Sequence, residues 1–308
     1  MQEKYIPLKR QRDIGDLITT YFDFLKTNFK PFLNIFISYN GIFILGFLGV
    51  SYLLVTGFVG TFAQTTTYGI ANDISNYQMY LIAGAVGFFV LFIITAILNY
   101  SLAAVYLIQY ENNKGIGVEK KKVWEMVKNN LGKIILFIIL LIFMYLVVMI
   151  VGVVISFIPI LGTFAYYLLI LAYTSWMGLS FMSMIKDNKE VTEAFGEGWT
   201  LLKKYFWKSV LTNLVVGLLL GILMMVVLMV PGILIGVYAF HSLDTGVDLA
   251  NSPIANVVWT LALTVVLILY TINQSLAQFV NGILYYSLHE ETYNEATREN
   301  INNIGAGE

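Results

Sequence analysis

The sequence predicts an all-α polytopic membrane protein, and three observations lead there: its composition, its long uncharged runs and the placement of its basic residues. Of its 308 residues, 58% are hydrophobic and only 12% are charged. A soluble domain carries about 25% charged residues, so this chain has about half the usual supply. Its composition excludes a soluble enzyme, a disordered protein and a basic nucleic-acid binder.

Six runs without Asp, Glu, Lys or Arg reach the roughly 20 apolar residues that a transmembrane helix needs. They cover residues 32–58, 79–110, 134–157, 162–185, 209–240 and 253–288. A helix over 209–240 would be about 48 Å long, against an apolar bilayer core of about 30 Å. We therefore expect a kink or break at Pro231-Gly232 and a tilt in the last run.

The basic residues predict the orientation. All 18 Lys and Arg lie in four segments, six in 1–30, six in 111–133, five in 186–208 and one in the C-terminal tail. The alternate loops between the runs contain none. Because Lys and Arg remain on the cytoplasmic side, both termini are predicted to be cytoplasmic, in a multi-pass protein of the bacterial inner membrane.

Each basic segment that precedes a pair of runs has apolar residues at helical spacing, three or four positions apart. These residues are Ile14, Ile18, Phe22, Leu25 and Phe29; then Trp124, Val127 and Leu131; then Phe195, Trp199, Leu202 and Phe206. We expect three amphipathic helices along the cytoplasmic interface. The candidates for contact with lipid headgroups are Lys128, Lys203, Lys204, Trp124, Trp199 and Trp207.

These segments also indicate a threefold internal repeat. A shift of 102 carries Phe22 onto Trp124, and a further 75 reaches Trp199; a shift of 174 carries Ser101 onto Ser275. Each unit would be an interfacial helix followed by a transmembrane hairpin, all in the same orientation. The three predicted units cover about residues 13–110, 118–185 and 192–288. They belong to a single membrane domain, residues 1–308, whose last part, 289–308, is a polar cytoplasmic tail.

The third basic segment resembles a known family. Residues 193–208 follow the Ala…Trp-x-Leu…Phe-Trp pattern of the glycerophosphodiester phosphodiesterase membrane domain, which related bacterial multi-pass families share. Residues 13–18, 28–32, 231–234 and 284–286 are similar to its other landmarks. In that family the chemistry belongs to a separate soluble barrel with metal-binding His and Glu residues, and nothing in this sequence resembles that barrel. The resemblance therefore implies a membrane domain and no catalytic residues.

Several polar residues fall inside the uncharged runs, where amides and hydroxyls need hydrogen-bond partners. Gln274, Gln278 and Asn281 recur at helical spacing on one face of the last run. The complete set of candidates is Asn99, Ser101, Asn213, Asn273, Gln274, Gln278 and Asn281. They either join neighbouring helices or line a polar path. Gly217-x-x-x-Gly221 and Gly232-x-x-x-Gly236 are expected to support close internal packing.

The sequence predicts no enzyme, no cofactor and no metal site. It has no Cys and only two His, which lie in different predicted loops, and it has no phosphate-binding or nucleophile motif. The leading hypothesis is a non-catalytic inner-membrane protein that acts through lipids or through a membrane or cytoplasmic protein partner. The alternative is a transporter or lipid-handling protein with a polar path between its hairpins. The interfacial helices could also serve only to anchor the bundle.

Overall fold

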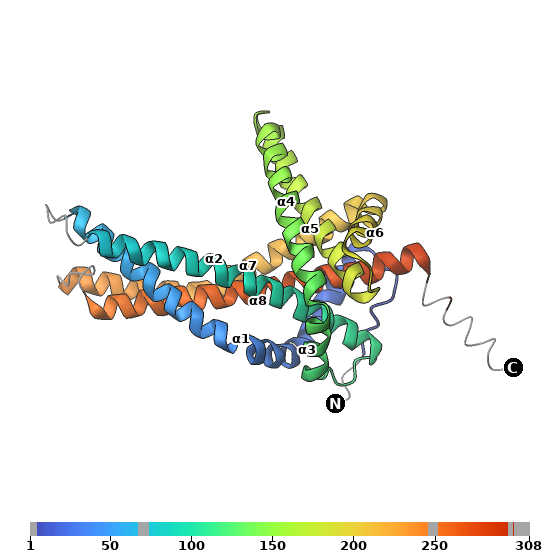
Figure 1. Ribbon diagram of the computed structural model, residues 1–308, viewed down its shortest axis with the longest axis horizontal. Coiled ribbons are helices and arrows are strands. Elements are labelled where there is room, and N and C mark those ends of the chain that lie inside the picture. Colours follow the sequence, from blue (N-terminus) through green and yellow to red (C-terminus); the bar gives the residue numbers. More distant parts are fainter. Residues whose placement is uncertain (1–4, 67–73, 246–251, 295–297, 299–308) are drawn as a thin grey trace. The chain divides into compact units, whose positions relative to one another are not determined.

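The computed structural model describes residues 5–66, 74–245, 252–294 and 298, and within these ranges the chain is helical without any strand. Figure 1 shows the arrangement of the helices. Their bounds are α1 Ile14–Thr66, α2 Ile74–Asn112, α3 Lys120–Asn129, α4 Leu131–Ser156, α5 Leu161–Lys186, α6 Val191–Lys204, α7 Phe206–Thr245 and α8 Pro253–Tyr293.

Six of these helices, α1, α2, α4, α5, α7 and α8, are long and apolar enough to cross a membrane. Each contains one of the six predicted runs, except that the third run extends one residue beyond the end of α4, so the predicted all-α six-span fold is confirmed. Helix is the expected form because the apolar core of a bilayer offers no partner for a backbone N–H or C=O outside the helix itself. The chain is a multi-pass membrane protein.

Two predicted helix boundaries do not exist. The first amphipathic segment is not a separate helix, because α1 runs through Pro31 without interruption. Likewise α7 continues as one helix through Pro231, so of the expected kink or break the break is absent. Proline has a helical φ and removes only one backbone hydrogen bond, and long apolar helices in membranes tolerate that loss. The second and third amphipathic segments do form separate helices, α3 and α6.

The chain forms two compact units. Unit 1 contains residues 1–35, 97–219 and 275–308, and unit 2 contains 36–96 and 220–274. Neither unit coincides with one of the predicted repeats, which remain a prediction.

Unit 1 has an aromatic core in which α1, α2 and α8 meet. The rings of Phe32 and Phe279 lie 4.7 Å apart and those of Phe32 and Tyr106 lie 5.4 Å apart, both edge to face. Edge-to-face pairs of this kind add about 0.5–1.5 kcal/mol each beyond the burial of their area. The aromatic residues of the first and last helices therefore hold the two ends of the sequence together.

Unit 2 is held together by close approach of α1 and α2. An added Cβ at Gly57 would lie 2.7 Å from the backbone nitrogen of Leu81, and one at Gly84 would lie 3.0 Å from that of Leu54. Two helix backbones can approach this closely only where the side chain is absent. A hydrogen bond from Asn256 Nδ2 to Thr56 Oγ1, 3.0 Å long, joins α8 to α1 in the same unit.

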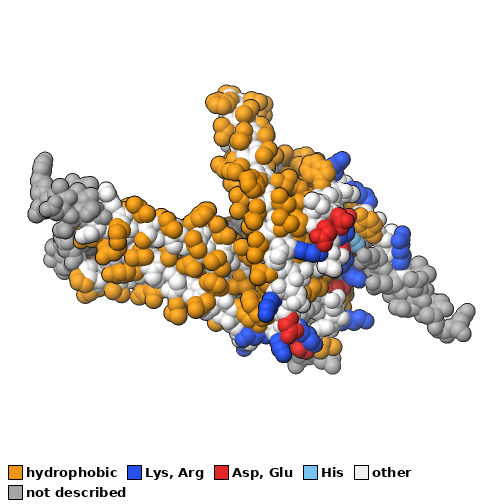
Figure 2. Space-filling model, viewed as in Figure 1, with side chains coloured by type: hydrophobic (Ala, Val, Ile, Leu, Met, Phe, Trp, Pro, Cys, Tyr) orange, Lys and Arg blue, Asp and Glu red, His pale blue; other side chains and the backbone are white. Residues whose placement is uncertain are grey.

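The α4–α5 hairpin belongs to unit 1. Tyr173 Oη donates to the backbone oxygen of Leu141 at 2.9 Å, and an added Cβ at Gly162 would lie 2.1 Å from the Ile155 carbonyl oxygen. In Figure 2 apolar side chains cover this hairpin along its length, whereas the Lys, Arg, Asp and Glu side chains gather around its base. This distribution is the one expected of a hairpin surrounded by lipid.

Candidate functional site

Three exposed aromatic residues occupy the positions that the predicted repeat places in register. The exposed fraction is 36% for Phe22, 40% for Trp124 and 52% for Trp199. All three belong to unit 1, on α1, α3 and α6. An exposed aromatic residue at each matched position is what an interfacial role requires, since aromatic rings with polar neighbours favour the headgroup layer.

Exposed lysines accompany these rings. Lys128 lies on α3, and Lys203 and Lys204 lie in the last turn of α6; all three side chains are exposed. The Nζ atom of Lys204 lies 5.1 Å from the ring centre of Tyr205. Trp207, at the start of α7, is 62% exposed. All six candidate headgroup residues are thus accessible at the surface of unit 1.

The apolar face predicted for α6 is divided between the surface and the protein interior. Trp199 is exposed, but Leu202 is buried and the ring of Phe195 stacks on that of Phe137 in α4, 4.8 Å away. The division has a steric cause: Gly198 lets α6 approach α5 so closely that an added Cβ would lie 2.1 Å from Ser180 Oγ. Only one edge of the helix remains exposed.

A charged network holds α6 against the ends of α5 and α8. Asp187 accepts a 2.6 Å hydrogen bond from Tyr285 Oη and pairs with Lys186 Nζ at 2.9 Å. Lys189 Nζ lies 3.3 Å from Glu197 of α6, and Tyr293 Oη donates to the same carboxylate at 2.9 Å. These side chains join three helices at one end of unit 1.

The ionised form of Asp187 is favoured in this network. Burial opposes its ionisation, but the hydrogen bond from Tyr285 and the charge of Lys186 outweigh burial and lower its pKa. Sequence reasoning missed this cluster. The only local signal was the Lys186-Asp187 pair directly after an apolar run, and the partners on α8 lie about a hundred residues further on.

The amide stripe of the last run is buried, in two parts. Gln274 is 8% exposed in unit 2, whereas Gln278 and Asn281 are fully buried in unit 1. Asn281 packs on Gly178 of α5, where an added Cβ would lie 2.1 Å from Asn281 Cγ. Neither polar atom of Gln278 or Asn281 has a hydrogen-bond partner within the described part of the chain. They fill helix contacts and are not exposed to a solvent channel.

Of the other polar candidates, Asn213 and Asn99 take part in hydrogen bonds between helices. In unit 1, Asn213 Nδ2 donates to Ser175 Oγ at 2.9 Å and thereby joins α7 to α5. Ser275 Oγ donates to the backbone oxygen of Asn99 at 3.2 Å, joining α8 to α2. Ser101 is buried and donates to a carbonyl of its own helix at 2.6 Å. Asn273, in unit 2, is partly buried.

Exchanging the two unpartnered amides for apolar residues of similar shape, Gln278→Met with Asn281→Leu, should leave the free energy of unfolding unchanged or raise it. A buried polar group without a partner costs about 1–3 kcal/mol, and removing it recovers that cost. Reversible unfolding in mixed detergent micelles measures the change. A loss of more than about 1 kcal/mol would show that these amides have polar partners in the membrane.

Within the described residues no group of three or more His, Asp or Glu side chains is arranged to hold a metal ion. Comparison of the chain with protein-family models, with curated proteins and with solved structures finds no match.

Proposed function

We propose that this multi-pass membrane protein acts without catalysis, by binding lipids and docking a partner through one surface of unit 1. We call this the aromatic–basic surface; its residues are Phe22, Trp124, Trp199, Trp207, Lys128, Lys203 and Lys204. The observation that supports the proposal is the exposure of an aromatic residue at each of the three matched positions, with exposed lysines beside two of them. We also propose that the chain is related to the glycerophosphodiester phosphodiesterase membrane domain.

The chemistry of this surface suits anionic phospholipids. An indole ring favours the headgroup layer, where its apolar ring and its polar N–H are both accommodated. Each Lys near an anionic membrane surface contributes about 1 kcal/mol of attraction. The three lysines are exposed and pair with no carboxylate among the described residues, so they supply a substantial preference for anionic over zwitterionic lipid.

The interior favours this function over transport. A polar path needs side chains that face water or solute, whereas Gln278 and Asn281 are fully buried and Asn281 is in contact with the backbone of α5. Asn213, Ser175 and Ser275 make hydrogen bonds between helices. Such contacts are typical of polar residues that join membrane helices.

Changing Lys128, Lys203 and Lys204 together to Gln should reduce the enrichment of anionic lipid around the protein at least tenfold, given about 1 kcal/mol for each lysine. The protein is reconstituted with equal parts of phosphatidylglycerol and phosphatidylcholine and extracted in mild detergent, and the retained lipids are quantified by mass spectrometry. The matched control changes Lys120, Lys121 and Lys122, of which the last two pair with acidic neighbours on the same segment. Unchanged enrichment in the first variant would overturn the proposal.

A further inference from the structure

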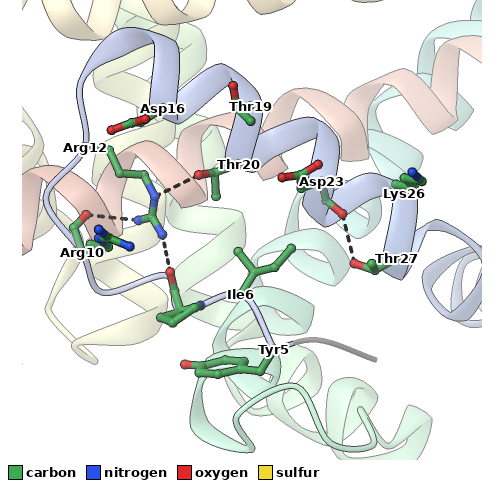
Figure 3. Close-up of a pocket in the computed structure, with 11 residues that line it drawn as sticks. Tyr5, Ile6, Arg10, Arg12, Asp16, Thr19, Thr20, Asp23, Lys26 and Thr27 are labelled. Carbon is green, nitrogen blue, oxygen red and sulfur yellow. Dashed lines mark hydrogen bonds between the residues drawn. The ribbon is translucent and has the colours of Figure 1, made fainter. Parts of the chain in front are cut away.

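A pocket of about 550 Å³ lies at the N-terminal end of the described chain. One wall is residues 5–12, which we call the strap, and the other is the polar face of the first turns of α1 (Figure 3). Two hydrogen bonds fix the strap to α2 within unit 1: Ile6 N–H donates to Tyr110 Oη at 2.9 Å, and Leu8 N–H donates to Glu111 Oε2 at 2.8 Å. The pocket is therefore formed before any ligand arrives.

Arg12 lines this pocket and is only 8% exposed. Its guanidinium donates to the backbone oxygens of Pro7, Leu8 and Arg10 and to Thr20 Oγ1. All four acceptors are neutral. No carboxylate of the described residues lies within ion-pair distance of this guanidinium, and one of its five N–H groups remains for another acceptor.

A buried charge without a counter-ion is costly. Burial and the neighbouring charge of Arg10 both lower the pKa of Arg12, while Glu111 and Asp16 offset this only in part. Arg10 lines the same pocket and carries a second positive charge. The pocket thus attracts an anion with several acceptor oxygens, and guanidinium groups suit phosphate best.

Two carboxylates face the same pocket from α1. Asp16 and Asp23 stand seven residues apart on one face of the helix, both exposed and neither in an ion pair with any described residue. Figure 3 shows them on the first turns of α1 on either side of Thr20, with Asp16 nearer to Arg12. A site with a buried guanidinium and with carboxylates along its wall is complementary to a molecule that carries both charges.

The setting of the pocket indicates a lipid. Helix α1 runs from the pocket directly into the first membrane-spanning segment. Phe22 and Phe29 are exposed on the same helix, 36% and 39%, next to the pocket-lining positions. A headgroup in the pocket would leave its acyl chains to pack on these rings.

We propose that this pocket binds the headgroup of a phospholipid with a primary ammonium, of the phosphatidylethanolamine type, with its phosphate on Arg12 and Arg10 and its ammonium on one of the two α1 carboxylates, Asp16 or Asp23. This inference rests on the proposed lipid-binding function and names a lipid for a second position on unit 1. It differs from the aromatic–basic surface in requiring a positive charge on the ligand as well as a negative one.

The test uses the purified full-length chain in detergent, with short-chain phosphatidylethanolamine, phosphatidylcholine and phosphatidylglycerol of equal chain length as probes and native mass spectrometry as the readout. Phosphatidylethanolamine should bind about tenfold more tightly than phosphatidylcholine, whose trimethylated nitrogen cannot donate hydrogen bonds to the carboxylates. Asp16→Asn with Asp23→Asn should abolish that preference. Arg10→Gln should weaken both lipids alike.

The matched control is Glu119→Gln with Glu125→Gln, two exposed carboxylates on or next to α3 that lie outside the pocket; the preference should persist there. Equal affinity for phosphatidylethanolamine and phosphatidylcholine would overturn the proposal, as would a preference that survives the loss of both aspartates. Free phosphoethanolamine that binds as tightly as the lipid would show that the site takes a soluble ligand instead. The lysine variant of the aromatic–basic surface should retain the preference, so the two proposals fail independently.

Discussion

Replacing Gly178 with alanine should lower the free energy of unfolding by about 1–3 kcal/mol, the usual cost of overpacking a close-packed contact. The new methyl group would lie 2.1 Å from Asn281 Cγ and 2.4 Å from Asn281 Cβ. The second distance decides the outcome, because the Cβ atom moves only if the whole of α8 moves. To make room for the methyl group, α5 and α8 would have to move apart at a point where both helices are fully buried.

The same glycine-to-alanine change at Gly217 provides the control. Gly217 is exposed on α7, and no described atom lies within 4 Å of an added Cβ there. Alanine favours helix over glycine by about 1 kcal/mol, so this variant should be as stable as the parent or more so. Combining Gly178→Ala with Asn281→Ala should recover part of the loss, since Cγ and Nδ2 are removed. The free energies of unfolding are measured in mixed micelles. Equal values for Gly178→Ala and Gly217→Ala would contradict the close contact between Gly178 and Asn281.

Asp187→Asn should cost about 2 kcal/mol, since it leaves partly buried partners without their counter-charge. Its side chain is 19% exposed and that of Lys186 is 13% exposed, so water replaces the lost interactions poorly. Asparagine can still accept a hydrogen bond from Tyr285 but carries no charge for Lys186 or Lys189. A matched change, Glu125→Gln, breaks an ion pair whose side chains are 87% and 56% exposed and should cost less than about 1 kcal/mol.

The contribution of the Asp187 carboxylate to the free energy of unfolding should decrease at acidic pH. Because the folded protein lowers the pKa of this carboxyl, its contribution is fully present above the unfolded value of about 3.9. The contribution is lost as the pH falls through the lower, folded value. Parent and Asp187→Asn should therefore differ most at neutral pH and converge below about pH 4. A difference that stays unchanged as the pH falls well below about 4 would show that the carboxylate charge contributes nothing.

The sequence predicted the spans well because hydrophobicity along one chain decides which segments can enter a bilayer. It predicted contacts between helices poorly. Gly217 and Gly221 fit a close-packing motif, yet no described atom approaches either, so the expectation of internal packing is wrong there. Gly178 and Gly198, which make contacts of 2.1 Å, belong to no such motif. Two small residues on one face make close packing feasible, but only the tertiary arrangement supplies a second helix.

For the candidate residues, too, the sequence predicted burial better than it predicted contacts between helices. The burial of most polar candidates was predictable, since an amide in an apolar run has to face protein, although Asn213 and Asn273 are only partly buried. The division of the α6 face was not predictable, because both Leu202 and Trp199 fit the same apolar spacing and nothing in the sequence marks the first as buried and the second as exposed. Arg12 was not singled out either: among the six basic residues of the first segment, nothing marks the one that the strap buries.

The tip of the α4–α5 hairpin has a consequence for biogenesis. Only residues 157–160, Phe-Ile-Pro-Ile, connect the two helices, and their apolar side chains are largely exposed. To insert such a hairpin, the cell has to move no charged side chain through the bilayer, and Pro159 also removes one backbone N–H from the segment that crosses. The hairpin can therefore partition from the translocon into lipid as a single unit, without a separate step that carries a polar loop to the other side.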